Sequence, residues 1–357
     1  MAERTVTEGK VKLRLVVPRV VSSAMPVFYN PIMHQNRDIA LMVIRAMGKK
    51  RLRIADPMAG SGIRGLRFLR ELPKSVIAHI DMNDSDPRAL RAIRRHCSLN
   101  KISAGERQVL SLTKLDASSL LQSGTWDYID IDPFGSPIPF LDAAVQALRS
   151  HGILALTATD TAPLAGSAPK ACMRKYWAVS RNDAQKHEWG LRILIRKAQL
   201  IAAQYERALF PLLSYWNEHY YRLYLEFVPG KTKVDGILSA HTNVHGIGPL
   251  WTGRLGDGSF VRKVYKNATE FLDGKSVAGQ LSKIYHETKI MQVGFLDAHG
   301  IARERKWKMV PSITALVALI RSNNHAAAQT HLAQAGIRTT MGRSQLIALA
   351  EEYLNVL

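Results

Sequence analysis

A repeated alternation of short apolar strands with helical segments, between residues 52 and 158, constrains the fold of this chain most strongly. The expected strands cover residues 52–56, 76–82, 108–112, 126–131 and 153–158. Strands that alternate with helices at this spacing are typical of a parallel sheet covered by helices on both faces. The sequence therefore predicts an α/β domain, and helical and aromatic strand patterns after about residue 190 predict a smaller α+β region.

A glycine-containing loop joins the first expected strand to its helix. Gly60-x-Gly62-x-x-Gly65 follows Asp56 and matches the dinucleotide-binding pattern, which by itself is weak evidence of a cofactor. A dehydrogenase uses such a loop to place a pyrophosphate at the helix N-terminus, whereas a methyltransferase lets the loop backbone approach a sulfonium amino acid. Asp56 favours the second use, because its negative charge repels a pyrophosphate and attracts an ammonium or sulfonium group.

Carboxylates follow two further strands of the expected sheet. Asp84 lies about 20 residues beyond the glycine loop, where a carboxylate can accept hydrogen bonds from both ribose hydroxyls of a cofactor. Asp116 follows the next strand and could accept from an adenine amino group. Asp81 and Asp86 are alternatives to Asp84, but we expect Asp81 inside the strand and Asp86 at the N-cap of a helix that begins with Pro87.

The strand near residue 130 ends in a polar and aromatic corner, Asp132-Pro133-Phe134-Gly135. Ligands of open α/β sheets bind beyond the carboxyl ends of strands. A carboxylate there can accept a proton from an amine, and a phenyl ring can stack on a base. Asp132 and Phe134 are therefore candidate catalytic residues, although an ordinary turn has the same pattern. We expect Asp130 on the same strand face and deeper in the sheet.

The chain is strongly basic, with 49 Lys and Arg against 29 Asp and Glu and a net charge of +20 over 357 residues. This excess favours nucleic acid as the partner. A membrane surface is the alternative, but the sequence has no apolar run of membrane-spanning length. Residues 1–12 contain no apolar signal region, so we expect a cytoplasmic protein.

Two clusters combine cations with aromatic residues, as RNA-contacting surfaces do. One contains Lys170, Arg174 and Lys175, and the other surrounds Arg305. For the second cluster, a solvated basic surface is an equally good interpretation. Only two cysteines, Cys97 and Cys172, are present, too few for a disulfide framework or a thiolate zinc site, so both are expected to be buried.

Taken together, the motifs resemble those of the S-adenosylmethionine-dependent tRNA guanine dimethyltransferases that modify guanosine 26. The likeness runs nearly end to end. The glycine loop is shared by many methyltransferases, whereas the Asp-Pro-Phe-Gly corner with an upstream Phe-Tyr-Asn-Pro is fairly specific. The matching segments are residues 27–31, 36–38, 56–64, 83–84, 130–137, 169–176, 248–253 and 336–340.

The resemblance implies a Rossmann-like class I methyltransferase domain with an N-terminal extension over residues 1–188, and an α+β tRNA-binding domain over residues 189–357. It implies that Asp132 acts on the guanine and that Phe28 and Phe134 sandwich the base. The residues that it assigns to the cofactor S-adenosylmethionine are Arg37, Asp56, Gly60, Gly62, Arg64, Asp84, Asp116 and Ala117.

This chain departs from the family pattern at one place. Many members carry a four-cysteine zinc site in the second domain, where this chain has His241 and His245. Two histidines without thiolate partners are expected to be solvated loop residues, so we predict no metal site. We also expect Asn36 to be a helix N-cap, and the segment after Thr161, rich in Pro, Gly and Ala, to be a loop.

A fixed carboxylate suits the implied chemistry. The exocyclic amine of guanine is a poor nucleophile, because its lone pair is delocalised into the ring, and it must lose a proton during methyl transfer. Guanine presents donors at both its ring N–H and its amine, whereas adenine and cytosine present a ring acceptor that a carboxylate repels. The alternatives are an amino methyltransferase acting on adenine in RNA or DNA, a non-catalytic RNA-binding protein and, less favoured, a nicotinamide dehydrogenase.

Overall fold

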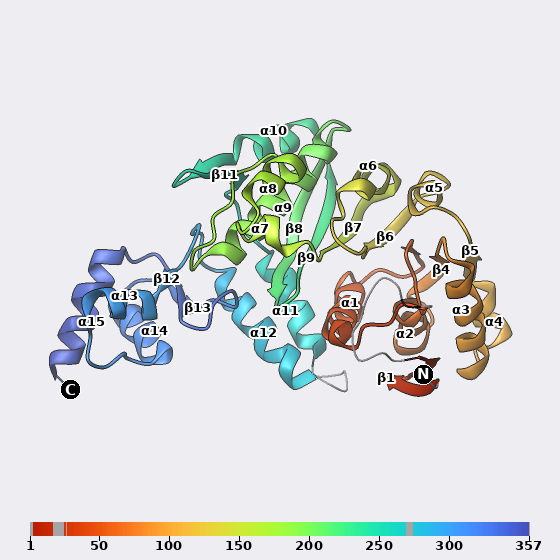
Figure 1. The fold of residues 1–357 in the computed structure, drawn as a ribbon, viewed down its shortest axis with the longest axis horizontal. Coiled ribbons are helices and arrows are strands. Elements are labelled where there is room, and N and C mark those ends of the chain that lie inside the picture. The colour runs from red at the N-terminus through yellow and green to blue at the C-terminus, as the bar shows by residue number, and fades with distance from the viewer. Residues whose placement is uncertain (1–2, 17–24, 26, 269–273, 357) are drawn as a thin grey trace.

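A seven-stranded sheet organises the molecule (Figure 1). The computed structural model describes residues 3–16, 25, 27–268 and 274–356. The strand order is β5-β4-β3-β6-β7-β9-β8, in which the first five are parallel and the last two are antiparallel to their neighbours. The strands are β3 (Leu52–Asp56), β4 (Ile77–Asn83), β5 (Leu110–Thr113), β6 (Trp126–Ile131), β7 (Leu148–Ala158), β8 (Arg207–Asn217) and β9 (Tyr220–Pro229). The predicted α/β fold with a mostly parallel sheet is confirmed.

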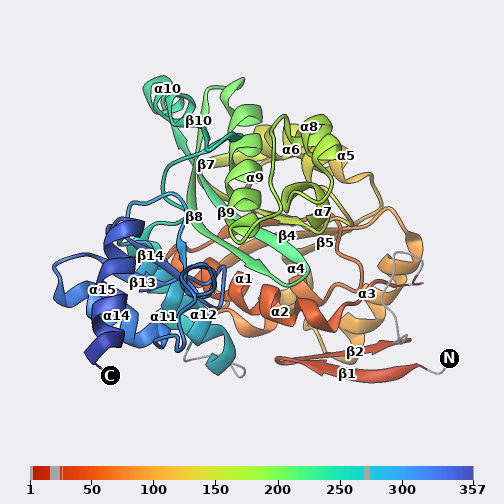
Figure 2. The same ribbon diagram turned by 60° about the vertical axis from the view of Figure 1, so that its left-hand side comes forward.

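Helices cover both faces of this sheet (Figure 2). Successive residues of a strand point to opposite faces. Ile54 and Tyr128 therefore pack in one apolar layer, and their neighbours Ala55 and Ile129 in the other. The first layer contains residues of α1 (His34–Ala46), α2 (Ile63–Glu71), α3 (Pro87–Leu99), α11 (Gly258–Asn267) and α12 (Gly274–Glu287). The second contains residues of α5 (Ala117–Gln122), α6 (Ile138–Ala147) and α9 (Lys186–Ala203).

Two predictions about local structure were wrong. Asn36 is not an N-cap, because a 3-10 helix (Pro31–Met33) capped by Asn30 leads directly into α1, and Asn36 lies buried inside that helix. The segment after Thr161 is not only loop, because it forms α7 (Thr161–Leu164) and α8 (Pro169–Tyr176). Proline is tolerated in a first helical turn, where its missing N–H would have no intrahelical partner. The predicted cap of α3 by Asp86 is confirmed, as is the burial of both cysteines.

The strands β8 and β9 form a hairpin that extends the central sheet beyond β7. The expected division between residues 188 and 189 falls within α9, so it separates this hairpin from the sheet that it completes. The aromatic residues between 215 and 227 predict strands from their local propensity. The edge of the sheet that these strands join is instead set by packing against residues distant in the sequence.

The C-terminal unit has a small sheet of order β12-β14-β13 and its own apolar core. It contains β12 (Leu296–Asp297), α13 (Ala298–Arg305), α14 (Ile313–Ser322), β13 (Ala327–Gln329), β14 (Gly336–Thr339) and α15 (Arg343–Val356). The other elements are β1 (Arg4–Glu8), β2 (Val11–Leu15), α4 (Ala104–Gln108), α10 (Lys231–Ser239), β10 (His241–Val244) and β11 (Ile247–Trp251). No helix among the described residues is long and apolar enough to cross a membrane.

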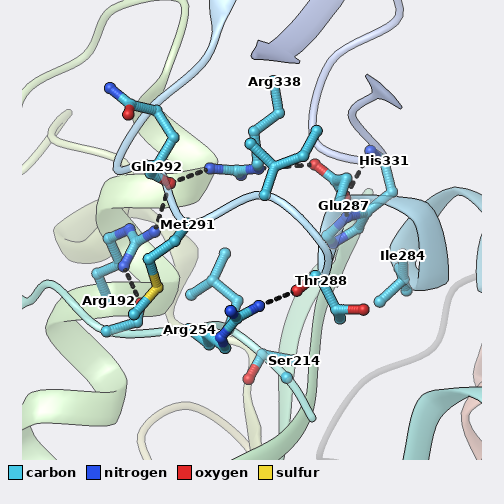
Figure 3. Close-up of a pocket in the computed structure, with 14 residues that line it drawn as sticks. Arg192, Ser214, Arg254, Ile284, Glu287, Thr288, Met291, Gln292, His331 and Arg338 are labelled. Carbon is cyan, nitrogen blue, oxygen red and sulfur yellow. Dashed lines mark hydrogen bonds and ion pairs between the residues drawn. The ribbon is translucent and has the colours of Figure 1, made fainter. Parts of the chain in front are cut away.

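A cluster of buried charges joins the C-terminal unit to α9, beside the pocket drawn in Figure 3. Glu188 accepts hydrogen bonds from Arg192 at 2.8 Å and from Arg338 at 2.7 Å. Arg338 also contacts Glu287, whose carboxylate pairs with His331. These five residues, called the junction cluster below, pair mainly with one another and with backbone carbonyls, so they fix the C-terminal unit against the sheet.

Candidate active site

The glycine loop after β3 is held from two sides. The Gly60 N–H donates to Asp84 Oδ2 at 2.9 Å, and the Ser61 N–H donates to the Phe28 carbonyl at 3.1 Å. Gly60 has φ +54°, and a Cβ there would lie 3.1 Å from the Phe28 carbonyl oxygen. The loop therefore links the ends of β3 and β4 to the segment before α1, as a cofactor loop at a sheet edge requires.

Asp84 lies at this edge, and its two alternatives have structural roles. Its Oδ1 accepts from the Asp86 N–H at 2.9 Å. Asp86 caps α3 and pairs with Arg88 at the surface. Asp81 lies within β4 and accepts from the Trp126 indole at 2.7 Å. Of these three carboxylates, Asp84 is the one that contacts the loop.

Asp116 and Ala117 lie beyond the end of β5. Asp116 is exposed and caps α5 by accepting from the Ser118 N–H at 2.8 Å, and Ala117 is buried at the start of that helix. Sequence reasoning placed Asn83 at a strand end but gave it no role. The Asn83 amide bonds the Pro57 carbonyl and both the N–H and the carbonyl of Leu115. Asn83 therefore holds the glycine loop and the Asp116 segment at one edge.

Behind the corner lies a second group of buried charges, called the rim cluster below: Asp56, Arg64, Asp130, Asp132 and Arg222. Arg64 lies 3.2 Å from Asp130 and pairs with Asp132, and it also donates to Asn36 at 3.0 Å. Arg222, from β9, donates to both oxygens of Asp130 at 2.9 and 2.7 Å. Burial raises the pKa of Asp130, but the two arginines more than offset this effect and lower it.

Asp132 differs from Asp130 in its environment, although both carboxylates contact Arg64. The Asp130 side chain is fully buried, whereas 22% of the Asp132 side chain is exposed. Within the described residues, only Oδ2 of Asp132 has a hydrogen-bond partner, which leaves Oδ1 open. The prediction that Asp130 lies deeper in the sheet than Asp132 is confirmed.

Asp56 is buried at the end of β3 with one oxygen, Oδ2, lacking a partner in the described part of the chain. Burial raises the pKa of this carboxyl to about 7; Arg64 opposes the rise, and Asp130 and Asp132 add to it. A buried polar atom without a partner is costly, and such atoms occur where a ligand supplies the missing contact. A cationic group placed here would provide that contact and lower the pKa.

Phe28 and Phe134 lie in edge-to-face contact, with ring centroids 4.5 Å apart and an angle of 76° between the rings. Phe134 is 55% exposed. The structure brings the two predicted rings together, but at this separation no base fits between them. A sandwich requires the rings to part.

Arg37 is placed differently from the other predicted cofactor residues. Its guanidinium donates to both carboxylate oxygens of Glu8, at 2.6 and 2.5 Å, and to the Asn30 carbonyl at 3.0 Å. Burial raises the pKa of Glu8, but Arg37 and Arg67 more than offset this and hold it at about 2. No sequence pattern around Glu8 indicates that it pairs with Arg37. This pairing holds β1 against the loop before α1.

The predicted RNA-binding residues lie on two separate surfaces. Lys170, Arg174 and Lys175 are exposed on α8, and Lys175 pairs with Asp160 at 3.0 Å. Arg305 ends α13 and pairs with Glu351 at 2.8 Å. The pair of Arg305 with Glu351 is exposed, and exposed pairs contribute little to stability, so phosphates can compete for Arg305.

One prediction about the histidines was wrong. His241 is not a solvated loop residue, because it begins β10, is half-buried and bonds Gln199 at 2.8 Å. Burial lowers its pKa to about 4. His245 is exposed. A search of the described residues finds no cluster of His, Cys, Asp and Glu that could hold a metal ion.

A Rossmann-like sheet with a glycine loop, a carboxylate at the next strand end and an acidic and aromatic corner defines the methyltransferase class of proteins. Within that class, the family model of the N2,N2-dimethylguanosine tRNA methyltransferases matches residues 4–245 and 238–351. The chain belongs to this family, which confirms the predicted family and enzyme class.

Individual relatives agree with the family match. The tRNA (guanine(26)-N(2)/guanine(27)-N(2))-dimethyltransferase of Aquifex aeolicus is 32% identical, with 97% of this chain and 95% of the relative covered. The tRNA (guanine(26)-N(2))-dimethyltransferase of Thermococcus kodakarensis is 34% identical, with 91% and 93% covered. The structure of Trm1 from Pyrococcus horikoshii with S-adenosyl-L-methionine matches with a TM-score of 0.87 at 30% identity, over 97% of this chain and 99% of that one.

Proposed function

We propose that this protein transfers methyl groups from S-adenosylmethionine to the exocyclic amine of guanosine 26 in tRNA, giving mono- and then dimethylguanosine. The observation that carries the proposal is the presence of a partly exposed Asp132 and an exposed Phe134 in one corner beside the glycine loop. Family membership and the relatives of known activity support the substrate and the methyl donor.

S-adenosylmethionine supplies an electrophilic methyl group, and the strand-end residues suit its three parts. Asp56, with its unpartnered buried oxygen, suits the ammonium of the methionine portion. Asp84 suits the ribose hydroxyls, and Asp116 with Ala117 suits the adenine. Gly60 and Gly62 let the loop backbone approach, and Arg64 holds the acids behind the loop. Arg37 acts on the cofactor site indirectly, because its bonds to Glu8 and to the Asn30 carbonyl hold the loop before α1 in place.

Asp132 is the proton acceptor in this proposal. Arg64 fixes its Oδ2, so the open Oδ1 can accept from the guanine amine and ring N–H. The same pair of donors makes guanine the preferred base, because adenine and cytosine present a lone pair to the carboxylate. Arg64 would keep the carboxylate oriented, and Asp132 would take the proton of the amine as the amine nitrogen bonds to the methyl carbon. The bond from that carbon to the sulfonium sulfur would break in the same step, and the demethylated cofactor would leave.

Phe134 and Phe28 hold the flipped base in this proposal. Stacking contributes ~1–3 kcal/mol per base, enough to offset much of the cost of leaving the tRNA stack. The exposed Phe134 offers its ring first, and Phe28 covers the second face of the base once the two rings part. Lys170, Arg174, Lys175 and Arg305 contribute phosphate contacts in this proposal, and residues 189–357 form the tRNA-binding domain.

The test is incubation of unmodified tRNA with methyl-labelled S-adenosylmethionine, followed by digestion to nucleosides. Labelled N2-methylguanosine and N2,N2-dimethylguanosine are expected, and a tRNA with adenosine at position 26 should stay unlabelled. Labelled methyladenosine would instead support an adenine methyltransferase. Binding of tRNA without any labelled nucleoside would support a non-catalytic RNA-binding protein. Binding should weaken steeply with salt, because each neutralised phosphate releases condensed counterions.

A further inference from the structure

One tryptophan outside the catalytic corner, Trp177, exposes much of its ring to solvent, and packing of the core does not require this exposure. Trp177 follows α8 and is 54% exposed. Its backbone is left-handed, with φ +54° and ψ +45°. At a helix C-terminus this conformation favours glycine, and a bulky side chain adopts it only where surrounding contacts enforce it. A large apolar ring at such a position, facing solvent, therefore points to binding.

The surrounding contacts hold the ring in place and cover one of its faces. The Trp177 N–H donates to the Met173 carbonyl at 3.1 Å, and Arg196 donates to the Trp177 carbonyl at 3.2 Å. The Lys197 ammonium lies 2.8 Å from the centroid of the indole ring, as in a cation–π contact. Lys197 is only 2% exposed, and burial lowers its pKa to about 8. The exposed part of the ring is therefore presented to solvent from a rigid support.

The surface around Trp177 is cationic. On a helix, residues three and four apart share one face, so Lys170, Met173 and Arg174 lie on one side of α8, and Trp177 directly follows the C-terminal end of that helix. Both cations are exposed, and Met173 is 48% exposed. An aromatic ring among exposed cations suits a base with its phosphates, because every base has a π-face and each phosphate is anionic.

Contacts also connect this surface to the catalytic corner. Tyr176, the residue before Trp177, donates to Asp160 at 2.8 Å and bonds the Ser136 hydroxyl at 3.0 Å. Ser136 follows Phe134 by two residues. The hydrogen bond between Tyr176 and Ser136 therefore links the segment that carries Trp177 to the segment that carries Phe134.

We propose that Trp177 is a second base-stacking site, which holds an unpaired nucleotide of the tRNA while the target guanosine occupies the corner. Lys170 and Arg174 bind the phosphates beside that nucleotide. The proposal rests on the proposed function, because it assigns part of the surface that binds the same substrate.

The test compares Trp177→Ala and Trp177→Phe with Leu99→Ala, an exposed apolar residue at the end of α3. The dissociation constant for unmodified tRNA and the KM for tRNA should rise by roughly 5- to 150-fold in Trp177→Ala, the equivalent of one lost stacking contact. The kcat at saturating tRNA and the affinity for S-adenosylmethionine should change little. Trp177→Phe should retain most of the affinity, and Leu99→Ala all of it.

Equal tRNA affinity in Trp177→Ala and Leu99→Ala, with an active wild-type enzyme, would overturn the stacking site and leave the proposed function intact. Failure of the wild-type protein to methylate any tRNA would overturn the proposed function before any variant is compared. Fluorescence gives a second readout. A single-stranded oligoribonucleotide should quench the wild-type emission more than that of Trp177→Phe, and equal quenching would also overturn the proposal.

Discussion

The rim cluster and the junction cluster are both networks of buried charges, but their charges are balanced differently. In the junction cluster two glutamates face two arginines and a histidine. In the rim cluster three aspartates face two arginines. Burial raises the pKa of Glu188, but Arg338 and Arg192 more than offset this and lower it to about 2, whereas the pKa of Asp56 rises to about 7.

Under the proposed function, this difference separates a structural network from a catalytic one. Buried carboxylates with complete sets of partners stay charged and fix the parts that they join. The rim cluster leaves Asp56 with an unpartnered oxygen and Asp132 with an open one. Perturbed and incompletely paired acids of this kind are concentrated at functional sites. Under the proposed function, the cofactor and the guanine supply the missing partners.

The largest expected effect is on catalysis and comes from Asp132→Asn. The variant keeps the shape of the side chain but removes the proton acceptor, so single-turnover methyl transfer should fall by ~10²–10⁴-fold with little change in cofactor binding. Rapid-quench assays with labelled S-adenosylmethionine would measure it.

Asp130→Asn is the matched control, because both oxygens of Asp130 are bonded to Arg222. That variant leaves a buried arginine without its partner and should lose ~3–5 kcal/mol of unfolding free energy. Near-normal rates in Asp132→Asn, together with a folded but inactive Asp130→Asn, would show that the proton acceptor is Asp130.

Glu188→Gln should lower the unfolding free energy by ~3–5 kcal/mol, because it leaves Arg192 and Arg338 buried with one fewer anion. Chemical denaturation measures the change. Glu304→Gln is the control, because its pair with Arg343 is exposed and should contribute less than about 1 kcal/mol. A Glu188→Gln protein as stable as Glu304→Gln would mean that the junction cluster does not hold the C-terminal unit in place.

Asp84→Ala should weaken S-adenosylmethionine binding by ~1.5–3 kcal/mol, because it removes charge-assisted hydrogen bonds to the ribose and to the Gly60 N–H. Calorimetry would measure this change. Asp86→Ala removes the cap of α3 and should cost ~1 kcal/mol of stability while leaving cofactor affinity unchanged. The reverse result would assign the ribose contact to Asp86.

Asp56 and Glu188 are expected to make the stability of the protein depend on pH in opposite directions. The pKa of Asp56 rises on folding from 3.8 to about 7, so the folded protein keeps a proton that the unfolded chain releases. This contribution makes stability fall as the pH rises from about 4 to about 7, by at most ~1.4 kcal/mol per pH unit. The pKa of Glu188 falls from 4.5 to about 2, so its stabilisation is present above 4.5 and is lost as the pH falls through 2.

Asp56→Asn should therefore flatten the pH dependence of the unfolding free energy between pH 4 and pH 7, the window set by its pKa shift. Denaturation series at several pH values, without cofactor, would measure it. Saturating S-adenosylmethionine should flatten the wild-type curve in the same direction, because an ammonium beside Asp56 favours its charged form. An unchanged curve in the variant would exclude Asp56 as the titrating group.

The sequence by itself determined the alternation of strands and helices, the strand-end positions of Asp56, Asp84 and Asp132, and the N-cap of α3. These features depend on local periodicity and on side chains adjacent to strand and helix ends, which neighbouring residues specify. The family followed from the same motifs, because Phe28 and the Asp-Pro-Phe-Gly corner are read directly from the chain.

Only the tertiary structure decided which charges meet. Arg222 pairs with Asp130 from 92 residues away, because β9 joins the sheet beside β7, and Arg37 turns to Glu8 because β1 lies against the loop before α1. The contact between the two phenyl rings and the support of Trp177 by Lys197 are equally non-local. Such pairings depend on the order in which strands and helices pack, and no local pattern of residues encodes that order.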